Sequence, residues 1–123
     1  MEFDVLSNRV IGCAIEVHRH LGPGLLESAC LRCLSHELTL AGLQHETETP
    51  LPLAYKGVSL DCGYRLDLLV EDELIVELKC VEKILPIHRA QLLTYLKLTG
   101  KRVGLLINFN EARLVDGLER MVL

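Results

Sequence analysis

Residues 65–79 read RLDLLVEDELIVELK, and this stretch decides the fold. Two apolar runs flank the acidic turn 71–73, which is the pattern of a β-hairpin. Alternation along each run predicts one wholly apolar face per strand. These faces comprise Leu66, Leu68 and Val70 in the first strand and Leu74, Val76, Leu78 and Cys80 in the second. Because both faces should be buried on the same side of the sheet, we expect Val70 to pair with Leu74.

That register brings two carboxylates together. Asp67 then faces Glu77, and Arg65 faces Lys79, which shares a strand face with Glu77. Side chains directly opposite one another have Cβ atoms about 5 Å apart, and two carboxylates at that spacing need a cation or a shared proton. Mg²⁺ binds through one or two protein carboxylates and keeps other positions for water and substrate phosphate. The spacing therefore indicates either a magnesium site for phosphodiester chemistry or a surface hairpin with a cross-strand salt bridge.

The rest of the sequence predicts an α/β fold with a mixed sheet. The apolar run VGLLINF at 103–109 suits a strand covered on both faces and paired in parallel through a preceding helix. With 123 residues, the chain is expected to form one domain, 1–123. Hydrophobic periodicity and turn residues predict helices at 5–21, 24–41, 87–99 and 111–119, and strands at 44–55, 58–70, 74–80 and 103–109.

Glu27 occupies an unusual place in the predicted helix 24–41. At 100° per residue it lies in line with the apolar stripe of that helix, one turn before the leucines begin. A surface glutamate more often lies opposite such a stripe. Two interpretations remain open: Glu27 contributes to a site, or it complements the helix dipole in the first turn.

Charge is distributed unevenly along the chain. The formal net charge is −4, which does not favour a nucleic-acid binder. Residues 79–102, however, hold six basic side chains against one acidic side chain, a local balance of +5. This segment is either a solvated helix face or a surface that faces phosphate.

The five cysteines and the apolar segments bear on the cellular compartment. The start MEFDVL lacks the basic region of a signal peptide, and we expect reduced thiols in the cytoplasm. No uncharged apolar run approaches the ~18 residues that span a bilayer, so no membrane association is expected. Cys30 and Cys33 form a CxxC motif without a second ligand pair, which favours packed thiols over zinc.

These motifs resemble the PD-(D/E)XK nuclease superfamily. Asp67 matches the aspartate of the second core strand, and 77–79 (ELK) match the (D/E)-x-K of the third, although Leu66 stands where the motif has proline. More narrowly, most of the chain resembles the GxxExxY proteins, through 17–28, 51–79, 91–100 and 103–110. The GxxExxY motif itself falls at 24–30, where Cys30 replaces the tyrosine.

The resemblance implies a restriction-endonuclease-like αβββαβ core, with a mixed four-stranded sheet flanked by helices. It implies a nuclease dependent on Mg²⁺ or Mn²⁺ that leaves a 5′-phosphate and a 3′-hydroxyl. The expected site residues are Asp67, Glu77, Lys79 and Gln91 for catalysis; Asp67, Glu77, Glu27 and the Leu78 carbonyl for the metal; and Tyr95, Arg89 and Lys83 for substrate.

We expect the substrate to be nucleic acid, DNA rather than RNA. A nuclease this short is expected to work as a homodimer or within a larger complex. The alternative is a non-catalytic module that keeps the nuclease fold and binds nucleic acid or protein. A separate base-stacking platform is not evident, because the aromatic residues are few and dispersed.

Overall fold

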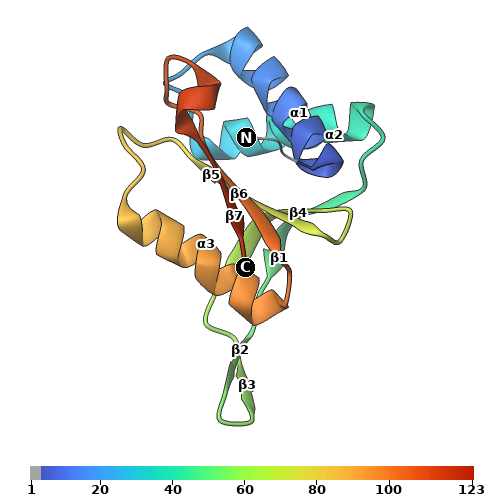
Figure 1. Ribbon diagram of the computed structural model, residues 1–123, viewed down its shortest axis with the longest axis vertical. Coiled ribbons are helices and arrows are strands. Elements are labelled where there is room, and N and C mark those ends of the chain that lie inside the picture. The colour runs from blue at the N-terminus through green and yellow to red at the C-terminus, as the bar shows by residue number, and fades with distance from the viewer. Residues whose placement is uncertain (1–3) are drawn as a thin grey trace.

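The computed structural model describes residues 4–123 (Figure 1). Residues 1–3 of the expected domain, and of the acidic start, lie outside the described residues. The helices are α1 (Val5–Leu21), α2 (Glu27–Leu40) and α3 (Pro86–Thr99), with a 3₁₀ turn η1 (Leu114–Gly117). The strands are β1 (His45–Pro50), β2 (Leu53–Tyr55), β3 (Val58–Leu60), β4 (Arg65–Val70), β5 (Leu74–Lys79), β6 (Val103–Asn108) and β7 (Leu118–Val122).

Five strands form one mixed sheet in the order β1-β4-β5-β6-β7. The pairing of β5 with β6 is parallel, and α3 provides the crossover between them; the other pairings are antiparallel. The strands β2 and β3 form a separate small sheet. Apart from them, the core elements follow the expected αβββαβ order, namely α2, β1, β4, β5, α3 and β6. The expectation of an α/β fold with a mixed sheet flanked by helices is confirmed, and the architecture is consistent with a restriction-endonuclease-like fold.

The sheet separates two hydrophobic clusters. On one face, α1 and α2 pack through residues such as Val10, Leu34 and Leu38 against alternate strand residues that include Val76 and Leu78. On the other face, α3 packs through a second cluster. Figure 1 shows α1 and α2 grouped on one side of the sheet and α3 on the other. The second cluster comprises Leu51, Leu66, Leu69, Ile75, Ile84, Leu92, Tyr95, Leu96 and Leu106.

The C-terminal segment corrects one expectation. The predicted helix 111–119 is replaced by η1 and by β7, which adds a fifth strand to the predicted four. A Cβ atom on Gly117 would lie 2.7 Å from the carbonyl oxygen of Asn108, so only glycine fits this tight turn. The turn directs the following residues along β6, where Val122 pairs with Val103.

The two strands predicted before residue 70 are each divided. The range 44–55 forms β1 and β2, and 58–70 forms β3 and β4. Pro50 and Pro52 cannot donate ladder hydrogen bonds, and Gly63 adopts a φ of 77°. As a result β2 and β3 form a separate two-stranded hairpin, which projects from the body at the bottom of Figure 1.

Among residues 4–123, none of the helices combines the length and the apolar character that a bilayer span requires.

Candidate active site

The β-ladders are interrupted at Asp67. Val70 pairs with Leu74 as expected, but the β4–β5 ladder extends only to the pair Leu68–Val76. On the other side of β4, the β1–β4 register skips the position at which Glu48 would face Asp67, and Glu48 has a φ of 51°. Leu66 packs in the α3-side cluster, so the prediction that it shares a face with Leu68 is wrong. The backbone irregularity at Asp67 accounts for this change of side.

Two side chains replace the missing ladder bonds. The backbone N–H of Asp67 donates to Glu77 Oε1 at 3.0 Å, and the backbone N–H of Leu78 donates to Asp67 Oδ2 at 2.8 Å. Each carboxylate therefore bonds to the backbone of the opposite strand. The expected Asp67–Glu77 neighbourhood is present, although it is built from side-chain bonds and not from regular cross-strand pairing. The ladder does not reach the expected Arg65–Lys79 pair.

Glu77 is an ionisable side chain held in the protein interior. Only 5% of its surface is exposed. Burial, followed by the negative charge of Asp67, raises the pKa of Glu77 to about 9. The backbone N–H of Asp67 and the charge of Lys79 offset part of that rise in pKa. In the metal-free protein this carboxyl group holds a proton at neutral pH. A bound cation would replace that proton.

Lys79 and Glu27 lie at the edge of this pair. Lys79 is the last residue of β5 and is half-buried, and within residues 4–123 no carboxylate forms an ion pair with it. Glu27 is the first residue of α2. Burial raises the pKa of Glu27, Lys79 lowers it and Asp67 raises it. Although Glu27 is exposed by its overall area, its carboxyl group is thus within electrostatic range of the other two.

Gln91 and Tyr95 approach the carboxylates from α3. Tyr95 is only 4% exposed. Burial raises the pKa of Tyr95, the charges of Glu77 and Asp67 raise it further, and a hydrogen bond with Gln91 lowers it. Tyr95 therefore keeps its phenol proton at neutral pH. The helix spacing of four residues, which the sequence indicated, brings Gln91 and Tyr95 onto one face of α3.

Arg89 and Lys83 occupy different surroundings. Arg89 lies in the first turns of α3 and forms an ion pair with Glu119 of β7, with Nε at 2.7 Å from Oε1. Lys83 is exposed in the connection between β5 and α3. Of the basic segment 79–102, Lys101 is also paired, with Asp72. The segment is thus partly neutralised by acidic side chains from elsewhere in the chain.

Asn108 is a buried polar residue that the sequence patterns did not reveal. It is fully buried at the end of β6, where it pairs in parallel with Lys79. Its Nδ2 donates to the Val81 carbonyl at 2.8 Å, and its Oδ1 accepts from the Val81 N–H at 3.1 Å. Asn108 thereby fixes the chain that follows Lys79. An asparagine closing the otherwise apolar run VGLLIN was the available signal.

Two thiols adjoin the same region. Cys30 lies one turn after Glu27, and its Sγ is 3.7 Å from that of Cys80, which follows Lys79. Burial, followed by the proximity of Cys80, raises the pKa of Cys30 to about 12. All five cysteines are free thiols in the structure. Cys30, in the position that GxxExxY proteins fill with tyrosine, thus packs as a neutral thiol.

The donor set suits a hard cation without forming a complete cage. Asp67 and Glu77 offer adjacent carboxylate oxygens in a largely buried position, which fits the one or two carboxylates that Mg²⁺ requires. Yet among the described residues 4–123, no three His, Cys, Asp or Glu side chains lie close enough together to hold a metal ion. The expected three-carboxylate set is therefore not closed: two carboxylates meet, and Glu27 stays at longer range.

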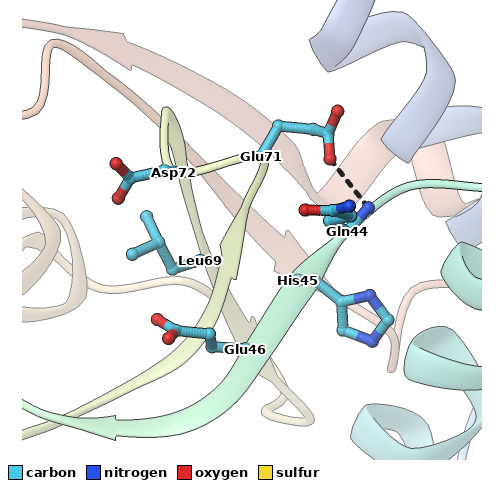
Figure 2. Close-up of a pocket in the computed structure, with 6 residues that line it drawn as sticks. All are labelled: Gln44, His45, Glu46, Leu69, Glu71 and Asp72. Atoms are coloured by element: carbon cyan, nitrogen blue, oxygen red, sulfur yellow. Dashed lines mark hydrogen bonds between the residues drawn. The ribbon is translucent and has the colours of Figure 1, made fainter.

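A separate pocket of about 360 Å³ lies at the turn end of the β4–β5 hairpin. Figure 2 shows its lining, in which Glu71 accepts a hydrogen bond from the Gln44 backbone N–H at 2.7 Å. Glu46 and Asp72 add two further carboxylates. No expected site residue lines this pocket, and its acidic character opposes phosphate binding.

Comparison with known proteins identifies the family. No curated protein and no solved structure was found to match the chain. A family model described as the PD-(D/E)XK nuclease superfamily matches residues 4–121, which is nearly the whole chain. The narrower GxxExxY assignment remains a resemblance. With the αβββαβ core and the Asp67–Glu77 pair in place, the match leads to one conclusion: the chain belongs to the PD-(D/E)XK nuclease superfamily.

Proposed function

We propose that this protein is a metal-dependent nuclease that hydrolyses phosphodiester bonds at the carboxyl end of β5. The observation that carries the proposal is the pair formed by half-buried Asp67 and buried Glu77, joined by reciprocal bonds to the opposite backbones, with Lys79 two residues after Glu77. Membership of the superfamily suggests nuclease activity. The metal dependence and the role of each residue are our proposals.

Asp67, Glu77 and the Leu78 carbonyl would hold Mg²⁺ or Mn²⁺, with Glu27 binding through water or after a small movement. The raised pKa of Glu77 supports this assignment, because a cation would replace the proton that burial and Asp67 otherwise favour. Such an ion would acidify water and stabilise negative charge on the phosphate. Asp67 and Glu77 are already positioned by their backbone bonds, so binding requires little reorganisation of these two side chains.

Lys79 would stabilise the charge that develops on the phosphate or orient the attacking water. Its ammonium group is free of ion pairs with the described carboxylates and is therefore available for phosphate. The Asn108 clamp on Val81 holds the backbone next to this lysine. A backbone held in this way keeps the start of the Lys79 side chain in place relative to the carboxylates.

Gln91 would position Tyr95, and Tyr95 would contact the carboxylates or the substrate. The burial of Tyr95 at 4% exposure favours a positioning role through its hydroxyl group. Lys83 is exposed and can meet phosphate directly. Arg89 would first have to exchange its partner Glu119 for a phosphate.

A cleavage assay with matched variants tests the proposal. Wild type, Lys79→Ala and Glu77→Gln, purified identically, are incubated with end-labelled single- and double-stranded DNA and RNA in Mg²⁺ or Mn²⁺. We expect the wild type to leave 5′-phosphate and 3′-hydroxyl ends. Loss of one transition-state contact should reduce the rate by about 100-fold or more. Equal cleavage by all three proteins would show that a contaminating nuclease is responsible, and the assay would then not support the nuclease proposal.

A binding module is the second candidate, because no three potential ligands gather within residues 4–123. This alternative predicts that wild type and Lys79→Ala bind the same nucleic acid and that neither cuts it at any Mn²⁺ concentration. A gain in thermal stability on adding Mn²⁺, lost in Glu77→Gln, would instead support the metal-dependent enzyme.

We further propose DNA as the preferred substrate, a homodimer or a larger complex as the working form and the cytoplasm as the location. The five free thiols are compatible with a reducing compartment. Matched DNA and RNA oligonucleotides test the first proposal, and sedimentation velocity with and without DNA tests the second. Fractionation of source cells with an antibody tests the third.

A further inference from the structure

Tyr64 presents an aromatic ring at the rim of the candidate site. It precedes β4 directly and stands three residues before Asp67. About 38% of its surface is exposed, whereas Tyr95, which it contacts, is 4% exposed. The two ring centroids are 6.1 Å apart with an interplanar angle of 68°, an edge-to-face contact. Aromatic surface therefore continues from the buried Tyr95 to the solvent.

The position of Tyr64 is fixed by its backbone as well as by its ring. Its carbonyl oxygen accepts a hydrogen bond from the Leu51 N–H at 2.9 Å, across the base of the β2–β3 hairpin. The preceding Gly63 donates its N–H to Asp61 at 3.0 Å, which shapes the turn that delivers Tyr64. A ring held at both its backbone and its edge loses little entropy when a planar ligand stacks on it.

Electrostatics restricts the sources of binding energy at this rim. The side chains around the site are acidic, with Asp67 beside Glu77 and Glu27 at longer range, and the chain carries a net charge of −4. Phosphate groups therefore gain little from the general field of the protein. A nucleobase is neutral at pH 7, and stacking on an aromatic face does not depend on charge.

We propose that Tyr64 is a base-stacking residue that positions the nucleotide next to the scissile phosphate, and that the substrate is consequently a strand with unpaired bases. This inference rests on the proposed nuclease function. Bases inside a duplex are already stacked on their neighbours, and exposing one costs a few kcal/mol. Single-stranded nucleic acid offers its base faces directly.

Three variants separate stacking from packing. Tyr64→Phe keeps the aromatic face, and Tyr64→Leu keeps apolar bulk against Tyr95 without a π face. Tyr55→Leu is the matched control, because Tyr55 is 57% exposed on the neighbouring β2–β3 hairpin and its ring contacts Lys56 at 5.5 Å. Thermal unfolding of each variant is measured first, so that loss of fold is distinguished from loss of stacking.

Binding is measured by fluorescence anisotropy with a labelled single-stranded oligonucleotide in EDTA, and KM is measured in Mn²⁺. Since each stacked base contributes about 1–3 kcal/mol, Tyr64→Leu should weaken binding, or raise KM, by roughly fivefold to a hundredfold. Tyr64→Phe and Tyr55→Leu should stay within about twofold of wild type. Oligonucleotides with 2-aminopurine at successive positions should show one position whose fluorescence changes with wild type and Tyr64→Phe but not with Tyr64→Leu.

The outcomes separate this inference from the proposed function. Wild-type cleavage with unchanged binding and KM in Tyr64→Leu overturns the stacking role alone. The stacking role is equally overturned if Tyr55→Leu loses as much affinity, or if a duplex closed at both ends is cut as well as the single strand. A wild type that neither binds nor cuts any substrate overturns the nuclease proposal itself. Should Tyr64→Leu fail to fold, the 2-aminopurine signal with Tyr64→Phe and the strand preference carry the test.

Discussion

Glu77 combines two requirements that ordinarily conflict in one side chain. It occupies a buried strand position, and it also accepts a hydrogen bond from the Asp67 backbone that substitutes for a ladder bond. Desolvation of a carboxylate is costly unless a proton or a cation is present. In the metal-free protein, the proton is favoured, and its presence makes stability depend on pH.

We expect the metal-free protein to lose stability as the pH rises from about 4.5 toward 9. Glu77 in the unfolded chain ionises near its ordinary pKa of 4.5, whereas burial and Asp67 raise its folded pKa to about 9. Between these values the folded state holds a proton that the unfolded state has released, so rising pH favours unfolding. Urea unfolding in EDTA at pH 5, 7 and 8.5 measures this trend.

Glu77→Gln should flatten that trend, because glutamine keeps the shape and cannot ionise. It should also abolish the stabilisation of the wild type by Mn²⁺, since it removes one anionic ligand. If the stability of Glu77→Gln still fell steeply with pH over this range, the pH dependence would come from another ionisable group.

Asp4 illustrates the opposite electrostatic case. It is the N-cap of α1, where it accepts hydrogen bonds from Ser7 and pairs with Arg120 at 2.8 Å. Burial raises its pKa, but the bonds from the Ser7 backbone, Arg120 and the Ser7 hydroxyl outweigh burial and lower the pKa to about 2.

Asp4→Ala should cost about 1 kcal/mol of unfolding free energy at pH 7. The folded pKa lies below the ordinary 3.8, so the stabilisation by ionised Asp4 is present above pH 3.8 and is lost as the pH falls through about 2. The wild type and the variant should therefore converge at about pH 2 in a urea titration. Asp4→Asn, which keeps a cap acceptor without charge, serves as the control and should show less pH dependence.

At this scale, the sequence predicted the residues that have a local signature. Alternation around the acidic turn predicted the Val70–Leu74 register and hence the Asp67–Glu77 neighbourhood. Asn108 was missed because its role depends on Val81, which lies 27 residues away in the chain. Only the parallel pairing of β5 with β6 brings these two together, and no local spacing encodes it.

At the level of elements, the connection after β5 depends on the end of β6. Asn108 bonds to both backbone groups of Val81, and Asn110 accepts a hydrogen bond from the Gly24 N–H at 3.0 Å in the turn before α2. Two neighbouring asparagines thus hold the segments that carry Lys79 and Glu27. The end of β6 and the residues directly after it therefore set the spacing between the end of β5 and the start of α2.

Asn108→Ala should destabilise the protein by about 2 kcal/mol, because it leaves a partly buried backbone donor and acceptor of Val81 without their Asn108 partners. The urea midpoint at constant m-value measures the loss. Thr39→Ala is the control: its hydroxyl also bonds a backbone carbonyl, that of Ser35, but it is exposed. The control should stay within about 0.5 kcal/mol of wild type. Equal effects of both substitutions would contradict the clamp.

The elements themselves were predictable in proportion to their own periodicity. The helix 5–21 has the same bounds in the structure, since its apolar stripe and the glycine that ends it are local features. The sequence LERMV at 118–122 has no comparable strand pattern, and β7 exists because β6 offers it an edge. The predicted strand 44–55 was too long: it contains prolines 50 and 52, and the structure divides it there into β1 and β2.

For the molecule as a whole, one sheet supplies a wall to both hydrophobic clusters. Strand β5 contributes Val76 and Leu78 to one cluster and Ile75 to the other. Loss of the helices on one face would expose apolar strand residues on that face and so destabilise the sheet. The helices on the other face pack against the same sheet. We therefore expect the two faces to unfold together as one domain.

Urea unfolding should give a single transition that coincides when monitored by far-UV circular dichroism and by tyrosine fluorescence. In the absence of tryptophan, the change in tyrosine fluorescence should come mainly from Tyr95 on the α3 face, because Tyr95 is the buried one of the three tyrosines. Far-UV dichroism reports on all helices, including α1 and α2. Two separated transitions would show that α1 and α2 form a unit independent of α3.

The reciprocal bonds of Asp67 and Glu77 have a practical consequence for the design of inactive proteins. Truncating either side chain also removes a bond between β4 and β5 beyond the Leu68–Val76 pair, so such a variant confounds lost chemistry with a loosened end of the hairpin. Lys79 carries no comparable structural duty, since its side chain joins no ion pair with residues 4–123. Lys79→Ala is accordingly the preferred inactive variant for capturing uncleaved substrate from a cell extract.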